Sequence, residues 1–151
     1  MKIFYSDKPL NLRLDLHSIF LAGPTPRSKS IKSWRPKAIE ILKSLGYNGQ
    51  VIVPETEFQS KNFDYIKQCE WENSGLKDCS VIVFWIPRNL KTMPAFTTNV
   101  EFGRFVRSNR TLYGRPDDAP KNRYLDWLYK KFNGNDISNN LKDLLTKAIN
   151  K

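Results

Sequence analysis

The feature that most constrains the fold of this chain is an uninterrupted apolar run, VIVFWI, at residues 81–86. No polar residue alternates with the apolar ones, so other parts of the protein must cover both faces of such a strand. Pro87 ends the run, because proline cannot donate a hydrogen bond to a strand ladder. The run therefore predicts a central strand of a parallel sheet with helices on both faces.

Three shorter apolar runs also stop at a glycine or a proline. They cover residues 18–22, 51–53 and 111–113, and they end at Gly23, Pro54 and Gly114. Short runs of this kind, closed by turn residues, are typical of buried strands. Each run is therefore predicted to be a further strand of the same sheet.

Between these strands, apolar residues recur with the spacing of helices. The predicted helices cover residues 33–45 with Ser33 as the N-cap, 63–77, a segment from about 96–98 to 106, 124–132 and 137–149. Residues 1–16 are predicted to form an N-terminal arm with a short strand. Alternating strands and helices indicate parallel βαβ units, so the whole chain, 1–151, is predicted to be a single α/β domain.

The net charge of the chain is +10, from 25 basic and 15 acidic residues. Such a charge favours anionic partners, but the basic residues are scattered among acids, as on an ordinary solvated surface. A nucleic-acid partner is not expected, because no basic stripe or nucleic-acid motif is present. No apolar run approaches the roughly 20 residues of a membrane span, so we expect no membrane insertion and a cytoplasmic location.

The residue types that bind metals are sparse. His17 is the only histidine, and the two cysteines, Cys69 and Cys79, match neither a zinc site nor a disulfide framework. Both thiols are predicted to be reduced and buried. We expect neither a metal nor a cofactor.

Ligands of open parallel sheets bind at the carboxyl ends of the strands. The segment TTNVEFGR, residues 97–104, follows the central strand and carries one carboxylate, Glu101. A glutamate early in a helix interacts with the helix dipole and with free N–H groups, which would keep Glu101 ionised and oriented, as a nucleophile requires. From these residues alone, a structural helix-end carboxylate and a nucleophile remain equally open.

Five segments, taken together and in order, resemble the nucleoside 2-deoxyribosyltransferase-like family. They are FLAGP at 20–24, WE at 71–72, DCSVIVFWIP at 78–87, residues 96–103, and YGRP at 113–116 with KNRYLD at 121–126. The resemblance extends from about residue 18 to residue 127. It implies a flavodoxin-like open parallel sheet flanked by helices, and frequent homo-oligomers.

The same resemblance implies transfer of deoxyribose from a 2′-deoxynucleoside to another free nucleobase. Glu101 matches the family's nucleophile, which would form a covalent glycosyl-enzyme as in retaining glycosyl transfer. Asp78 matches an acidic residue that binds or protonates the base, and Gly23 and Pro24 match a loop at the sugar and base. The remaining predicted substrate-binding residues are Thr25, Trp71, Glu72, Thr97, Asn99 and Arg115.

One departure from the family pattern concerns base recognition. The better-known transferases carry an aspartate about a turn and a half before the nucleophile, where this chain has MPAF at 93–96. Thr97, Asn99 or Glu72 are the predicted substitutes.

Two other functions stay open. The first is hydrolysis of nucleosides or nucleoside monophosphates on the same scaffold, for which the basic charge and Arg115 would suit a phosphate. The second is a non-enzymatic, basic nucleic-acid-binding module, against which the scattered charge argues.

Overall fold

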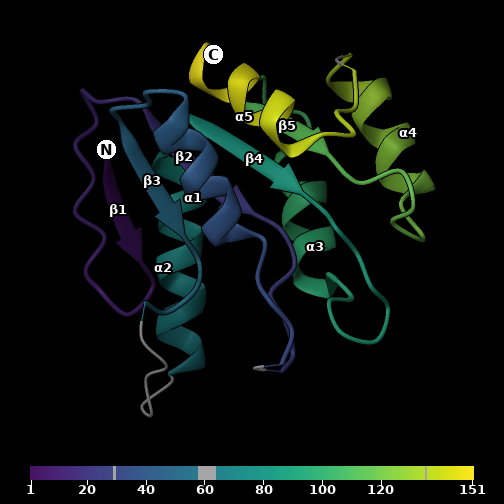
Figure 1. Ribbon diagram of the computed structural model, residues 1–151, viewed down its shortest axis with the longest axis horizontal. Coiled ribbons are helices and arrows are strands. Elements are labelled where there is room, and N and C mark those ends of the chain that lie inside the picture. Colours follow the sequence, from purple (N-terminus) through teal and green to yellow (C-terminus); the bar gives the residue numbers. More distant parts are fainter. Residues whose placement is uncertain (29, 58–63, 135) are drawn as a thin grey trace.

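The computed structural model describes residues 1–28, 30–57, 64–134 and 136–151 (Figure 1). Within these residues, five strands form one sheet in the order β1-β3-β2-β4-β5, and every neighbouring pair is parallel. The strands are β1 (Lys2–Tyr5), β2 (Ser18–Ala22), β3 (Gln50–Val53), β4 (Val81–Trp85) and β5 (Thr111–Gly114).

Helices cover both faces of this sheet (Figure 1). The helices α1 and α5 pack on one face, and α2, α3 and α4 pack on the other. Their bounds are α1 (Arg35–Ser44), α2 (Tyr65–Asp78), α3 (Phe96–Phe105), α4 (Arg123–Phe132) and α5 (Leu141–Ile149). The predicted α/β class is confirmed, and the arrangement is consistent with a flavodoxin-like fold.

The apolar run that predicted a central strand is β4, which lies between β2 and β5. All five of its residues are buried. Val81, Val83 and Trp85 pack in the core under α1 and α5, whereas Ile82 and Phe84 pack in the core under α2, α3 and α4. The run is continuously apolar because each face meets its own layer of helices.

Two helices begin later than predicted. The first, α1, begins at Arg35, and Trp34 rather than Ser33 occupies the N-cap position. The hydroxyl of Ser33 accepts a bond from the Arg35 amide at 3.2 Å and donates to Glu55 at 2.8 Å. Ser33 thus joins the helix start to the end of β3 instead of capping the helix.

The last helix, α5, begins at Leu141 rather than at residue 137. Ser138 bridges to Gly114 and so extends the edge of the sheet. The side chain of Asn140 then accepts from the amide of Lys142 at 2.8 Å, as an N-cap residue does. The predicted start of the second helix, Phe63, lies outside the described residues.

The N-terminal arm contributes an edge strand, since β1 pairs with β3. The side chain of Gln50, in β3, exchanges hydrogen bonds with the backbone of Arg13 and thereby holds the rest of the arm against the sheet. No helix in the part of the chain described here is long and apolar enough to cross a membrane.

The order of the strands determines where a ligand can bind. From β2 the chain moves outward to β3 and then returns to form β4 on the other side of β2. The carboxyl ends of β2 and β4 therefore form the topological switch point, where the connections that follow them diverge. In open α/β sheets, ligands bind in the crevice at this point.

Candidate active site

A cavity of about 340 Å³ opens at the switch point. The end of β2 and the loop of residues 23–25 form one side of it, α2 forms a second, and the start of α3 forms a third. Of the predicted site residues, the structure brings six to this cavity: Gly23, Pro24, Thr25, Glu72, Thr97 and Glu101.

Gly23 is required at its position by close packing. A β-carbon there would lie 2.2 Å from the carbonyl oxygen of Trp85 and 2.9 Å from the ring of Trp34, and the φ angle is +153°. The indole N–H of Trp34 donates to the carbonyl of Pro24 at 3.2 Å. The loop after β2 is therefore packed tightly on the end of β4 and on the start of α1.

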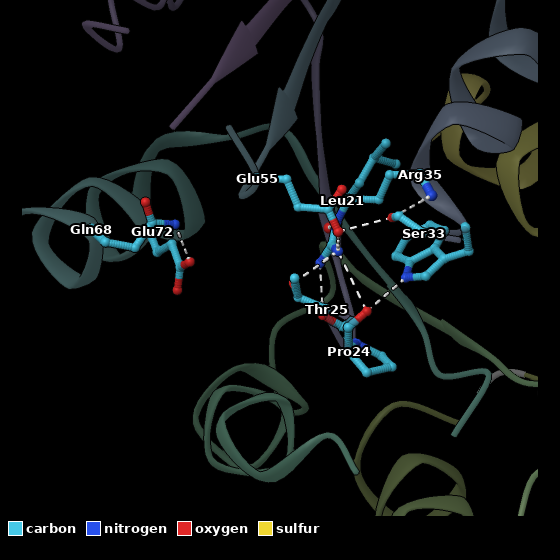
Figure 2. Close-up of polar contacts among 10 residues, drawn as sticks. Leu21, Pro24, Thr25, Ser33, Arg35, Glu55, Gln68 and Glu72 are labelled. Carbon is cyan, nitrogen blue, oxygen red and sulfur yellow. Dashed lines mark hydrogen bonds and ion pairs between the residues drawn. The ribbon is translucent and has the colours of Figure 1, made fainter. Parts of the chain in front are cut away.

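Arg35 lies beneath this loop and was not predicted as a site residue. Its side chain is only 1% exposed. It donates to the carbonyls of Leu21 at 3.0 Å and Gly23 at 2.7 Å and to the hydroxyl of Thr25 at 3.1 Å, and it pairs with Glu55 at 2.5 Å (Figure 2). The sequence carries one indication of this role. A cation in the first turn of a helix is unfavourable because it opposes the helix dipole, so an arginine at that position has another function in the fold.

One face of α2 forms a wall of the cavity. Tyr65, Gln68, Cys69 and Glu72 are spaced three or four residues apart and all line it. The side-chain amide of Gln68 donates to Glu72 at 2.5 Å (Figure 2). Burial raises the pKa of Glu72, while this hydrogen bond and the charge of Arg35 lower it. Residues three, four and seven positions before Glu72 share its helix face, so this spacing could have predicted Cys69, Gln68 and Tyr65 as lining residues.

Glu101 is half-buried and is the sixth residue of α3, beyond the first turn with its free N–H groups. Burial, together with the charge of Glu72, raises its pKa from 4.5 to about 7, and Arg35 and Arg104 act in the opposite direction. The helix start therefore does not hold the pKa of Glu101 low. Desolvation dominates at this position.

The start of α3 is strained and uncapped. Its N-cap residue, Ala95, has φ 63° and ψ 37°, which is the left-handed region, and it makes no side-chain capping bond. For a non-glycine residue this conformation costs about 1–2 kcal/mol. Because Ala95, Phe96 and Thr97 line the cavity, the positive end of the helix dipole also lies at its edge.

Asp78 does not reach the cavity. It is the last residue of α2, it is exposed, and it precedes the amino end of β4. Glu72 lies six residues earlier on the same helix, about 9 Å along its axis at 1.5 Å per residue. The helix runs from the carboxyl edge of the sheet to the opposite edge, so Asp78, which is near β4 in sequence, lies at the edge away from the cavity.

Trp71 and Asn99 also lie outside the cavity lining. The indole N–H of Trp71 donates to the backbone carbonyl of Lys8 at 2.9 Å, so this residue holds the N-terminal arm. The side-chain oxygen of Asn99 accepts from Arg88 at 2.7 Å. Both residues therefore stabilise segments next to the cavity rather than lining it.

Arg115 is held by an acidic partner away from the cavity. Its guanidinium makes a two-pronged pair with Asp126 of α4, with a shortest distance of 2.8 Å. The hydroxyl of Tyr113 donates to the same carboxylate at 2.9 Å. The pair joins the end of β5 to α4, and its charges are already neutralised.

Among the described residues, no group of three or more His, Cys, Asp and Glu side chains could hold a metal ion. Both cysteines are free. Cys79 is buried, which raises the pKa of its thiol to about 12, whereas Cys69 is only partly buried and lines the cavity.

Comparison with known families shows to which family this chain belongs. A family model described as "Nucleoside 2-deoxyribosyltransferase like" matches residues 16–119, which is more than half of the 151-residue chain. The chain belongs to the nucleoside 2-deoxyribosyltransferase-like family. A comparison with curated proteins finds no match. The segment shared with the family contains every residue that lines the cavity, whereas α4 and α5 lie beyond it.

Proposed function

We propose that this protein is a nucleoside deoxyribosyltransferase that uses Glu101 as its nucleophile. The observation that carries the proposal is the presence of two carboxylates, Glu72 and Glu101, in one cavity at the switch point of a family member's sheet. Glycosyl transfer with retention uses a pair of carboxylates, one as the nucleophile and one as the acid and base. The substrates are a 2′-deoxynucleoside and a free nucleobase.

In the first step, a carboxylate oxygen of Glu101 attacks the anomeric carbon of the deoxyribose. A carbon–oxygen bond forms, the carbon–nitrogen bond to the base breaks, and its electron pair stays on the base. Glu72, as the carboxylic acid, gives its proton to the departing base. Burial raises the pKa of both carboxyls, so the pair can hold one proton, and attack by Glu101 requires that this proton lies on Glu72. The resemblance to the family had assigned this role to Asp78.

In the second step, a nitrogen of the incoming base attacks the same carbon. The bond to Glu101 breaks and returns its electron pair to the carboxylate. The proton lost by the incoming base returns to Glu72, so the enzyme is regenerated without a metal or a cofactor. Two inversions at the anomeric carbon give overall retention.

The remaining walls of the cavity fit a nucleoside. The rings of Tyr65 on α2 and Phe96 on α3 are 63% and 67% exposed and both line the cavity, as flat surfaces for a base would. Thr25 and Thr97 also line the cavity, and the Thr25 hydroxyl, which accepts from Arg35, keeps its own proton to donate to the sugar. We assign the base to the aromatic rings and the sugar to the space beside Glu101.

An exchange assay tests the proposal. The protein is incubated with a deoxynucleoside and a different free base, and both products are followed by chromatography. A new nucleoside indicates transfer, whereas free sugar alone indicates hydrolysis. Glu101→Gln must abolish the exchange, and Glu70→Gln, at an exposed position of α2, must retain it. Full activity in Glu101→Gln would refute the role of Glu101.

A second candidate, in which a nucleoside monophosphate is cleaved, rests on Arg27. This arginine lines the cavity, its guanidinium lies 5.3 Å from the ring centroid of Phe96, and none of the ion pairs among the described residues involves it. The positive end of the α3 dipole lies beside it. Arg27 is thus better placed for a phosphate than Arg115, which Asp126 already neutralises.

We also propose that the protein is a homo-oligomer, as the resemblance to the family implies, and that it is cytoplasmic. Light scattering coupled to size exclusion measures the mass of the particle in solution. A mass of one chain would refute the oligomer.

A further inference from the structure

We propose that Arg35 is the positioning residue of this site: it holds the loop that forms one side of the cavity, and its charge acts on Glu101. The inference rests on the proposed role of Glu101 as the reacting carboxylate. Arg35 lines the cavity, but its side chain is only 1% exposed and each of its three guanidinium nitrogens donates to the protein, so we assign it no contact with the substrate.

The hydrogen bonds of Arg35 converge on a single stretch of backbone. The Nε atom donates to the carbonyl of Leu21, Nη2 donates to the carbonyl of Gly23, and Nη1 donates to the hydroxyl of Thr25. The rigid planar fork of a guanidinium can satisfy such divergent acceptors at once, whereas a lysine ammonium cannot. The conformation of the cavity loop therefore depends on this side chain.

Trp34 shields the same guanidinium from water. The guanidinium carbon lies 4.9 Å from the centroid of the Trp34 ring, and the indole N–H donates to the carbonyl of Pro24. A cation held over an aromatic face in a desolvated position is stabilised by the ring quadrupole. Arg35 is thus a fixed charge whose field is weakly screened by solvent.

Charged groups reach Glu101 from several elements. Glu72 faces it from α2, Arg35 acts from α1, and Arg104 acts from α3 itself. Glu55, at the end of β3, pairs directly with Arg35 and offsets part of its charge. The balance between Arg35 and Glu55 therefore contributes to the positive charge that Glu101 experiences, beside that of Arg104.

This arrangement predicts opposite effects from two conservative changes. Arg35→Gln removes the positive charge and must raise the pKa of Glu101. Glu55→Gln keeps an oxygen for Ser33 but removes the negative charge that offsets Arg35, so it must lower the pKa of Glu101. Loosening of the loop alone would not move this pKa in opposite directions in the two variants.

The experiment is a carbon-13 NMR titration of protein with labelled glutamate side chains, in which the Glu101 signal is assigned by its loss in Glu101→Gln. The expected result is a rise of about half a pH unit or more in Arg35→Gln and a comparable fall in Glu55→Gln. Shifts in the same direction, or no shift in either variant, would overturn the proposal.

A third variant keeps the test decisive if Arg35→Gln does not fold. Arg35→Lys retains the charge and loses the fork, so the pKa of Glu101 must stay near that of the parent protein while the exchange rate falls. With Arg35→Lys and Glu55→Gln, a rise in the Glu101 pKa in either variant would contradict the proposal.

The titration needs no catalytic activity, so the two proposals fail separately. If no nucleoside is exchanged and the NMR shifts are as expected, the proposed function falls and the role of Arg35 stands. If exchange occurs and the shifts are absent, the proposed function stands and the role of Arg35 falls.

Discussion

Glu72 of α2 and Glu101 of α3 line the same cavity, and the charge of Glu72 helps to raise the pKa of Glu101 to about 7. Two carboxylates brought together in a partly desolvated site destabilise one another's ionised form. Such a pair lowers the free energy of unfolding, and destabilising arrangements of this kind are common in active sites.

Activity is expected to rise with pH through about 7 as Glu101 becomes the nucleophilic carboxylate, and to fall at higher pH as Glu72 loses the proton that it donates. In Glu72→Gln the overall rate falls, since the proton donor is lost. The acid limb of the remaining activity moves to lower pH, since the charge that raises the Glu101 pKa is also lost. The measurement is kcat/KM against pH for both proteins. An acid limb that stays in place in Glu72→Gln would show that the two carboxylates do not interact.

Glu101→Gln is expected to stabilise the folded protein at alkaline pH. The folded-state pKa is about 7 against 4.5 for the free side chain, so the folded form binds an extra proton between these values and loses stability as pH rises through this window. The gain is about 1–3 kcal/mol at about pH 8 and vanishes near pH 4. Denaturant unfolding at both pH values measures it.

Glu70→Gln serves as the control for that measurement, because Glu70 is exposed on α2 and lines no part of the cavity. It must show no pH-dependent gain. An equal gain at both pH values in Glu101→Gln would mean that the stabilisation does not come from its ionisation.

Gly23→Ala and Gly103→Ala are expected to differ in sign. The first places a β-carbon 2.2 Å from the Trp85 carbonyl, so it lowers the free energy of unfolding by more than about 2 kcal/mol and distorts the cavity. The second adds a β-carbon within α3 with nothing within 4 Å, so it is neutral or stabilises by about 0.5–1 kcal/mol. Thermal melting of the two variants measures these changes in stability. Similar losses of stability in both would contradict the packing argument.

Arg27→Gln is expected to raise KM for a nucleoside monophosphate about tenfold and to leave KM for the matching nucleoside unchanged, if Arg27 binds a phosphate. Arg107→Gln is the matched control, because Arg107 also lies over an aromatic ring, that of Phe132, at 4.2 Å but lines no part of the cavity. Equal effects of Arg27→Gln on the two substrates would remove the second candidate function.

Local sequence patterns were sufficient to predict the strands and helices but not the residues at which each one begins and ends. The central strand β4 was predictable because burial on both faces leaves a continuous apolar run. The start of α5 was not, since Ser138 pairs with Gly114, a partner 24 residues away that no local pattern reveals. The edge position of β1 beside β3 depends on the same kind of long-range pairing.

The candidate site shows the same division. Glu101 and Glu72 were predicted from the segment after the central strand and from the resemblance to a family, and both line the cavity. Asp78 does not line it, because position along α2 decides which edge of the sheet a residue reaches. Arg35 was missed for another reason. Most of its partners are backbone carbonyls, and these have no signature in a sequence.

The packing of Gly23 against Trp34 and Trp85 limits how the substrate range of the protein can be altered. One side of the cavity is made of the same atoms that close the end of the sheet, so substitutions there disturb folding before they change selectivity. The side chains of Tyr65, Gln68 and Phe96 instead project from helices that can be varied separately. Libraries directed at these helix positions are where a broader range of bases should be sought.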